Sequence, residues 1–397
     1  MIRPNSATLV MVLSPLVAFG PISTDLYLPS LPAIAAAFDR PIGDAQLTLA
    51  AFLVGIALAQ LFGGALGDRF GRRPVMLGGL LLYTAASVGC ALAGSIEELI
   101  VYRFVQAFGA CGPQVLSRAV VRDLHERADA TRMLGYVGAI MGVAPVLSPF
   151  LGGYFVVWFG WTANFWFMGV YSALAFVLVY VMIQETAPTL ARDALDLRLI
   201  LAAFARVLRH PDSRTFGIPF CFVYSGMFAF FTGSSWVIIK VLGISTEAFA
   251  FYFGAVIVGF PTGAFVAGRL SARFAVETIF SVGVALAAGS GLVFLVLMAA
   301  GFVNAGTVVV PMLAYAIAVG LVNPSGIASM LAPFPDIAGK TSALLGAAQM
   351  ATSAATSVFV GALHDGTSLP TAACVAGAGV GALVIHVLAR RTRRVPA

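Results

Sequence analysis

Apolar stretches of about 20 residues recur along almost the whole chain, separated by short polar connections. A helix that crosses the hydrocarbon core of a membrane needs about 20 mainly apolar residues. Only 10% of the 397 residues are charged, whereas a soluble domain carries about 25%, so the chain cannot cover a water-facing surface. We predict an all-α membrane protein with twelve transmembrane helices in the lipid bilayer. The approximate spans are 8–32, 45–67, 74–94, 98–120, 132–157, 162–184, 215–239, 248–270, 276–300, 306–331, 341–363 and 370–389.

Positive charge is distributed unevenly over the connections. If both termini are cytoplasmic, only Arg40 and Lys240 fall in outer loops, and Arg103 lies inside a span. All other basic residues are then on the inner side: Arg3, Arg69, Arg72, Arg73, Arg118, Arg122, Arg127, Arg132, Arg192, Arg198, Arg206, Arg209, Arg214, Arg269, Arg273, Lys340, Arg390, Arg391, Arg393 and Arg394. Cytoplasmic loops are enriched in Lys and Arg. We predict a multi-pass protein of the cell inner membrane with both termini cytoplasmic, and no nucleic-acid partner.

The longest polar stretch divides the chain. Residues 185–214 predict a cytoplasmic linker with an amphipathic helix, between a six-helix half at 1–184 and another at 215–397. A weak repeat supports a duplication, because residues 64–73 and 264–273 occupy the same loop of each half, with Arg69 matching Arg269. Transporters built from repeats bind their substrate where the repeats meet.

One carboxylate falls well inside a predicted span. Asp25 lies in the first segment, where a charge costs from about 2.5 kcal/mol upward unless it faces water or a partner. Burial favours the neutral form of a carboxyl group, which suits reversible proton binding near neutral pH. We interpret Asp25 as a proton-binding group. The alternative is a structural acid near the outer end of the span, just before Tyr27.

Arg103 is the matching cation, in the fourth segment. Gln106, Gln114 and Ser117 roughly continue its face of the helix. An arginine within the membrane normally meets a carboxylate, a backbone carbonyl or water. Asp25 is a candidate partner, although the sequence leaves their contact open. Arg103 therefore has two possible roles, in proton coupling or as a structural tie between helices.

The connection between the second and third segments combines an acid, three arginines and several glycines. An ion pair of the acid at a helix end can hold the cytoplasmic side closed in one conformation and break in another, and glycines permit close helix packing. We predict a conformational latch formed by Gly64, Asp68, Arg69, Gly71, Arg72 and Arg73. Plain anchoring by positive charge is the alternative.

Small residues and prolines mark the fifth segment, and aromatic residues the seventh. The fifth carries Gly142, Pro145, Pro149, Gly152 and Gly153, which favour a flexible packing surface between the halves over a substrate site. The seventh carries aromatic residues at helical spacing, which either line a cavity for flat apolar compounds or face lipid. The full set of cavity candidates is Tyr27, Gln106, Gln114, Tyr224, Phe228, Phe231, Tyr315 and Asn323.

No cofactor is predicted. The chain has no phosphate-binding P-loop and no loop large enough for a nucleotide-binding domain, so transport would be driven by an ion gradient. The four cysteines lack CxxC spacing and the four histidines are scattered, so neither a metal site nor a disulfide framework is expected. We also expect no enzyme activity and a monomer.

Several motifs together resemble one family. Residues 25–32 (DLYLPSLP), 64–73 (GALGDRFGRR), 103–112 (RFVQAFGACG) and 142–153 (GVAPVLSPFLGG) resemble, in this order, signatures of the major facilitator superfamily, in its twelve-span drug:proton antiporter group. Residues 117–123 (SRAVVRD) and 335–343 (PDIAGKTSA) are most similar to the bicyclomycin/chloramphenicol-resistance (Bcr/CflA) branch. Ala107 and Ala144 depart from the common pattern.

The resemblance implies a major-facilitator fold of two pseudo-symmetric six-helix halves that alternate in access. It also implies that spans 1, 4, 7 and 10 line a central cavity, and that Asp25 and Arg103 couple protons. The expected function is proton-coupled efflux of small apolar or cationic drug-like compounds. The alternative is a metabolite exporter or importer, for an amino acid or a sugar. A receptor or enzyme without transport is disfavoured by the duplicated halves and the lack of a catalytic constellation.

Overall fold

The computed structural model describes residues 7–124, 127–187, 190 and 192–393, and the regular secondary structure of this part is helical. The first-half helices after the entry segment are α4 (Ile42–Phe70), α5 (Arg72–Ala91), α6 (Ile96–Leu124), α7 (Arg127–Phe159) and α8 (Thr162–Met182). The later ones are α10 (Ile218–Ser235), α11 (Thr246–Ile257), α12 (Gly259–Leu270), α13 (Val276–Ala299), α14 (Ala305–Leu331), α15 (Ala338–Ala362) and α16 (Leu369–Arg393). Short helical turns at η3 (Ser213–Gly217) and η4 (Trp236–Val241) extend α10 at both ends, and η5 (Pro335–Ile337) precedes α15.

The first predicted span is broken. It consists of α1 (Ala7–Val17), α2 (Phe19–Asp25), the turn η1 (Leu28–Ser30) and α3 (Leu31–Ala37), with a bend of 43° after Val17. Pro21 cannot donate a hydrogen bond to the carbonyl of Val17, four residues earlier, and its ring clashes with that carbonyl. The break therefore falls where this proline requires it, and Asp25 lies at the end of a short helix.

The twelve predicted spans all fall on helices of the structure. Within the residues that the structure describes, nine helices are long and apolar enough to cross a membrane, or ten if the bent first segment is one span. The remaining two spans fall on α6, which carries several charges, and on α7, which is described only in part. The all-α membrane fold is thus confirmed, while the count of twelve spanning helices stays a prediction.

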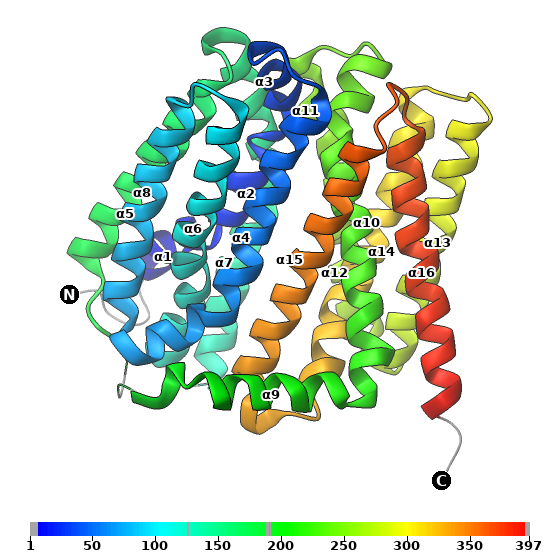
Figure 1. Ribbon diagram of the computed structural model, residues 1–397. Coiled ribbons are helices and arrows are strands. Elements are labelled where there is room, and N and C mark those ends of the chain that lie inside the picture. Colours follow the sequence, from blue (N-terminus) through cyan, green and yellow to red (C-terminus); the bar gives the residue numbers. More distant parts are fainter. Residues whose placement is uncertain (1–6, 125–126, 188–189, 191, 394–397) are drawn as a thin grey trace.

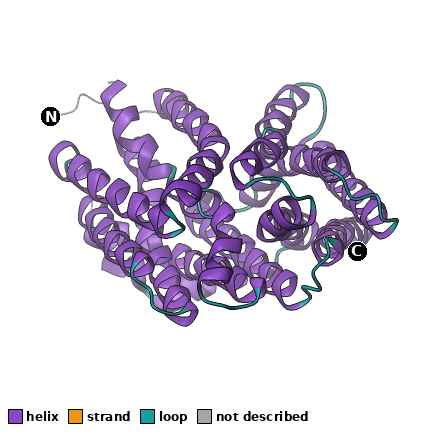
Figure 2. Cartoon of the chain, turned by 90° about the horizontal axis from the view of Figure 1, so that it is seen from above, coloured by secondary structure: helices purple, strands orange, loops and turns teal. Residues whose placement is uncertain are grey.

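The helices form two groups. α4, α5, α6 and α8 pack together in the N-terminal group, and α10, α13, α14 and α16 pack together in the C-terminal group. Figure 2 shows the two groups side by side. The main contacts between them join α4 to α15 and α7 to α11. The division into two six-helix halves stays a prediction.

The amphipathic helix in the linker is α9 (Leu197–Arg209), preceded by the turn η2 (Arg192–Leu195). It runs across the lower end of the molecule in Figure 1, beneath both groups. The Asp196 carboxylate accepts the backbone N–H of Arg198 at 2.8 Å and caps the helix start. Ile200, Ala203 and Val207 form its buried face. We call this end of the molecule the α9 face.

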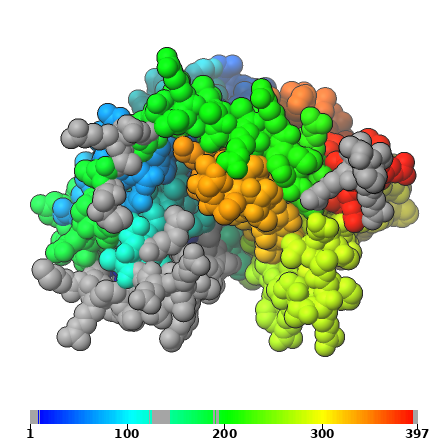
Figure 3. Space-filling view, turned by 90° about the horizontal axis from the view of Figure 1, so that it is seen from below, coloured from blue at the N-terminus to red at the C-terminus, as the bar shows by residue number. Residues whose placement is uncertain are grey.

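The two groups touch on the face opposite α9. The Gln46 amide on α4 donates to the carbonyl of Thr232 on α10 at 3.1 Å. The rings of Phe150 on α7 and Phe251 on α11 meet edge to face, with centroids 4.8 Å apart. On the α9 face, Figure 3 shows a hollow between the cyan surface of the N-terminal group and the orange and yellow-green surface of the C-terminal group. The molecule is therefore closed on one face and hollowed on the other.

Candidate functional site

Asp25 is the last residue of α2 and is only 3% exposed. The hydroxyl of Thr24 donates to its Oδ1 at 2.8 Å. A buried carboxylate usually needs a cation or several donors, and among the described residues Asp25 has one hydroxyl as its hydrogen-bond donor. Asp25 is thus a carboxyl group whose environment stabilises its charge weakly, which suits a group that binds and releases a proton.

Arg103 is fully buried in α6. Its guanidinium donates to Gln106 Oε1 at 2.6 Å and to the carbonyl of Ser23 at 2.8 Å. Aromatic rings enclose it, since Cζ lies 4.6 Å from the ring centroid of Tyr27 and 4.4 Å from that of Phe52. The negative faces of these rings attract the cation.

Asp25 and Arg103 do not form an ion pair. Among the described residues, no carboxylate oxygen lies within 4.0 Å of the Arg103 guanidinium. They are instead linked through the backbone, because Arg103 binds the carbonyl of Ser23 and packs on Tyr27, the residues two before and two after Asp25. Any change in the position of Arg103 therefore acts on the segment that carries the carboxylate.

A hydrogen-bond network holds Arg103 in place. Gln106, which accepts from Arg103, donates to Ser87 Oγ on α5 at 2.7 Å. Ser23 shares a hydrogen bond of 2.6 Å with the Tyr83 hydroxyl, also on α5. α2, α5 and α6 are thus tied around one buried cation.

The cavity candidates divide into two sets. Tyr27, Gln106 and Tyr315 are fully buried in this conformation, and their role in a substrate cavity stays a prediction. Hydrogen bonds within the protein account for this burial, because Tyr27 binds Thr48, Gln106 binds Arg103, and the Tyr315 hydroxyl donates to the Val223 carbonyl at 3.1 Å. Residue type and helical spacing did not show which face of the helix each side chain takes.

The second set keeps some exposure. Gln114, Tyr224, Phe231 and Asn323 are partly exposed, and Phe228 is buried but for 9%. The Phe228 and Phe231 rings contact each other with centroids 5.2 Å apart. These side chains come from α6, α10 and α14, so both helix groups contribute to the candidate cavity.

The latch residues form a charge cluster at the α9 face. Arg72 binds Asp68 at 2.5 Å and Asp123 at 3.2 Å, and Arg73 donates to the Tyr180 carbonyl at 2.7 Å. Arg69 stacks on the Phe70 ring. Gly64 is on the interior of α4 with open space around it, and Gly71 joins α4 to α5 with a φ of 98°. All these partners belong to the N-terminal group.

The sequence analysis did not assign two acids of this cluster, Asp123 and Glu185. Glu185 lies after α8 and accepts the backbone N–H groups of Arg72 at 2.8 Å and Arg73 at 3.2 Å, so it caps the start of α5. A carboxylate at a helix N-terminus is stabilised by the helix dipole. No local spacing marks this role, because Glu185 stands more than 100 residues from the helix it caps.

The carboxyl group of Glu185 is more acidic than usual. Partial burial alone would raise its pKa, but four backbone N–H groups, from Ala187, Arg72, Arg73 and Thr186, lower it below its ordinary value. The charged form of Glu185 therefore stabilises the connection between α4 and α5.

The adjacent glycines of the fifth segment face in two directions. A Cβ on Gly152 would overlap the carbonyl oxygen of Leu26, the residue after Asp25. A Cβ on Gly153 would lie 2.9 Å from the carbonyl oxygen of Thr246 in the C-terminal group. One glycine therefore lets α7 approach the segment of Asp25, and the next lets it approach the other group.

The rest of this motif is described in part. Pro149 is buried and Pro145 is partly exposed, both inside α7. The surroundings of Gly142 lie outside the described residues. No group of three or more His, Cys, Asp or Glu side chains that could hold a metal ion was found in the described ranges.

A bundle of apolar helices in two groups, with buried charges and a hollow on one face between them, defines the class of membrane transporters. A sequence model of the Major Facilitator Superfamily matches residues 13–358, and the chain belongs to this superfamily.

Named relatives support this assignment, and a solved structure has the same fold. The chain is 30% identical to a bicyclomycin resistance protein homolog of Haemophilus influenzae, over 91% of this chain and 90% of the relative. It is 28% identical to multidrug resistance protein D of Escherichia coli, over 87% and 86%. Its fold matches the crystal structure of a D-xylose-proton symporter with a TM-score of 0.72 at 17% identity, over 96% and 97% of the two chains.

Proposed function

We propose that this transporter exports small apolar or cationic drug-like compounds across the inner membrane in exchange for protons. The names of two of its relatives support the substrate class, because they are called bicyclomycin resistance and multidrug resistance proteins. The uneven distribution of Lys and Arg supports an α9 face in the cytoplasm. We further propose that the substrate passes between the two helix groups of one chain, and that the transporter acts as a monomer without a cofactor.

The environment of Asp25 is the main support for proton coupling. Its carboxylate is buried, has one hydroxyl as its partner, and has no cation within ion-pair distance among the described residues. Bringing such a charge out of water is costly, so protonation removes a penalty that a single hydroxyl partner offsets only in part. Gly152 packs against the next residue, so a change at Asp25 acts directly on α7, which contacts the other group.

Everted membrane vesicles test this proposal. Wild type should accumulate ethidium or a similar cationic dye when a proton gradient is imposed, and dye addition should release protons from the lumen. Asp25→Asn should reduce both signals to those of vesicles without the protein, because an amide cannot exchange the proton. Glu97→Gln is the matched control, since Glu97 forms an exposed ion pair with Arg40, and it should transport like wild type.

Two results would count against the proposal. Normal coupling in Asp25→Asn would make Asp25 a structural acid. Gradient-driven uptake of amino acids or sugars by wild type, without any effect on drug-like compounds, would assign the protein to metabolite transport instead.

A further inference from the structure

The linker helix α9 exposes three leucines along one side. Leu197, Leu201 and Leu208 are 54%, 55% and 61% exposed. At about 100° per residue, these positions lie within about 40° of one another around the helix axis, and we call them the leucine stripe. The buried face of α9 lies on a different side of the helix. The helix therefore has two apolar sides, and the protein covers only one of them.

Two arginines lie beside the leucine stripe. Arg198 and Arg209 are about 80–100° round the helix from the centre of the stripe, on the side away from the buried face, and both are exposed. Among the side chains that the structure describes, no carboxylate oxygen lies within 4.0 Å of either guanidinium. The neighbouring Arg206, by contrast, pairs with Asp336 at 2.5 Å. An apolar stripe flanked by two positive charges fits a partner that is both apolar and anionic.

Contacts with the C-terminal group fix the rotation of α9. The ion pair of Arg206 with Asp336 joins the helix to η5, and the Arg206 guanidinium lies over the Phe334 ring, 5.6 Å from its centroid. At the end of α9, the Ser213 hydroxyl donates to the Val207 carbonyl. The leucine stripe and the two arginines are therefore presented in a constant direction.

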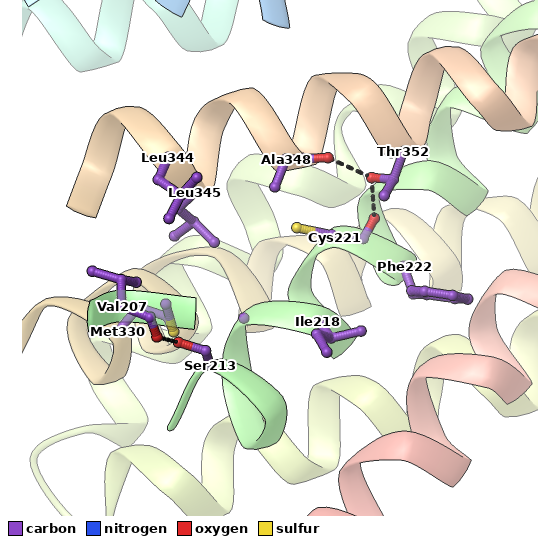
Figure 4. A pocket seen from close by; sticks show the side chains of 11 residues that line it. Val207, Ser213, Ile218, Cys221, Phe222, Met330, Leu344, Leu345, Ala348 and Thr352 are labelled. Carbon is purple, nitrogen blue, oxygen red and sulfur yellow. Dashed lines mark hydrogen bonds between the residues drawn. The ribbon is translucent and has the colours of Figure 1, made fainter. Parts of the chain in front are cut away.

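α9 lies at the level where a bilayer changes from hydrocarbon to headgroups. It packs against α15, which has 25 residues, and a helix of about 37 Å extends beyond a hydrocarbon core of about 30 Å. Val207 faces the same small apolar hollow as Leu344 and Leu345 (Figure 4), which lie about 10 Å from the start of α15. In Figure 3 the green α9 segment runs along the rim of the molecule. This position brings α9 to the boundary between acyl chains and headgroups.

We propose that α9 binds the anionic phospholipids of the adjacent membrane leaflet. The leucine stripe lies among the acyl chains, and Arg198 and Arg209 reach the phosphate groups. An amphipathic helix at this boundary buries its apolar side about 5–10 Å deep, and long basic side chains extend from there to the headgroups. Anionic lipids are preferred because each arginine is attracted to a negatively charged surface. This binding does not depend on the proposed export function.

Spin labels test where the leucine stripe lies, in the full-length protein reconstituted into vesicles of phosphatidylcholine and phosphatidylglycerol. The ratio of accessibility to oxygen over accessibility to a water-soluble nickel complex should be several-fold higher for a nitroxide on Leu201→Cys than on Leu199→Cys. Leu199 is the matched control, because it is 51% exposed on the opposite side of α9. Wild type treated with the same label gives the background of the native cysteines. Equal ratios at the two positions would overturn the proposal and leave the stripe to a soluble partner.

Amide hydrogen exchange in nanodiscs tests the preference for anionic lipid. In wild type, the exchange of residues 201–209 should be about tenfold slower with phosphatidylglycerol present than with phosphatidylcholine alone, because two arginines act together. Arg198→Gln combined with Arg209→Gln should reduce this difference to about twofold or less. Arg273→Gln is the matched control, since Arg273 is exposed in the connection between α12 and α13, and it should keep the full difference.

Wild type alone decides the lipid preference if the double variant does not fold. Equal exchange of residues 201–209 in the two lipid compositions would overturn the proposal. A loss of the difference in Arg273→Gln as large as in the double variant would also overturn it, because the overall charge of the protein would then account for the effect.

Discussion

Arg103 is a fully buried cation whose positive charge is accommodated by rings and neutral acceptors. Cation–π attraction reaches about 2 kcal/mol when the partners are desolvated, and Tyr27 and Phe52 both lie within 5 Å of the guanidinium carbon. Its planar fork binds Gln106 and Ser23 at once. Since neither acceptor is ionised, the charge of Arg103 remains available to attract Asp25 in another conformation.

Arg103→Lys should therefore destabilise the protein although the charge is kept. A lysine ammonium cannot stack on two rings while donating in both directions, and we expect a loss of about 2 kcal/mol from the free energy of unfolding. Thermal unfolding in detergent measures it. Arg40→Lys is the control, because Arg40 makes an exposed ion pair with Glu97, and it should cost less than about 0.5 kcal/mol. Equal losses of unfolding free energy in the two variants would show that the rings and acceptors around Arg103 add no stability.

Glu185 predicts a pH dependence of stability. Its pKa is lowered in the folded protein, so its contribution is fully present above the ordinary pKa of a glutamate and is lost as the pH falls through the lowered value. Glu185→Gln should thus be less stable than wild type at pH 7, by no more than about 1 kcal/mol because the site is largely exposed. The two melting temperatures should converge as the pH falls below about 4. A constant difference from pH 7 to pH 3 would contradict this role.

At the scale of elements, the space around each glycine indicates whether it serves helix packing in this conformation or in another one. Gly152 and Gly153 have no room for a methyl group, whereas Gly64 on α4 has open space around it. Gly64 is nevertheless part of the predicted latch. Open space in this conformation is expected if Gly64 packs against a partner only when the α9 face closes.

Three alanine variants follow from this difference. Gly152→Ala should prevent stable folding, because the methyl group would overlap the backbone of Leu26. Gly153→Ala should fold but separate the groups at Thr246, and so lower the transport rate. Gly64→Ala should raise stability by roughly 0.5–1 kcal/mol, as expected for a glycine in a helix interior, and yet impair transport. Thermal unfolding and vesicle transport check all three, and a Gly64→Ala protein with normal transport would argue against the latch.

The sequence predicted the helices better than their contacts. Long apolar segments located α4, α8 and α13 because lipid requires a continuous helix, whereas the break in the first segment was not predicted. The Asp123 and Glu185 contacts were missed because they join residues far apart in the chain. The burial of Tyr315 was missed because apolar character all around a helix does not show which face meets another helix. The roles of the site residues stay predictions.

At the scale of the molecule, several contacts join the two groups opposite α9, in addition to the packing of α4 along α15. Gln46 with Thr232, Phe150 with Phe251, and Gly153 with Thr246 all join the groups opposite α9. On the α9 face, the ion pairs of Arg72 with Asp68 and Asp123 lie within the N-terminal group. In an alternating-access cycle the contacts opposite α9 are expected to break in the other state.

Locking the closed face should therefore stop transport. Phe150→Cys combined with Phe251→Cys places two thiols where the native rings now touch, and a short bifunctional thiol reagent should join them. Export should cease as the cross-link forms and return when a cleavable reagent is reduced, because the two groups must separate on this face to open it. Phe150→Cys alone, treated with the same reagent, controls for reaction at the native cysteines, three of which are buried. Undiminished export with the cross-link complete would mean that these contacts stay closed throughout the cycle, and that access alternates by some movement other than the separation of α7 from α11.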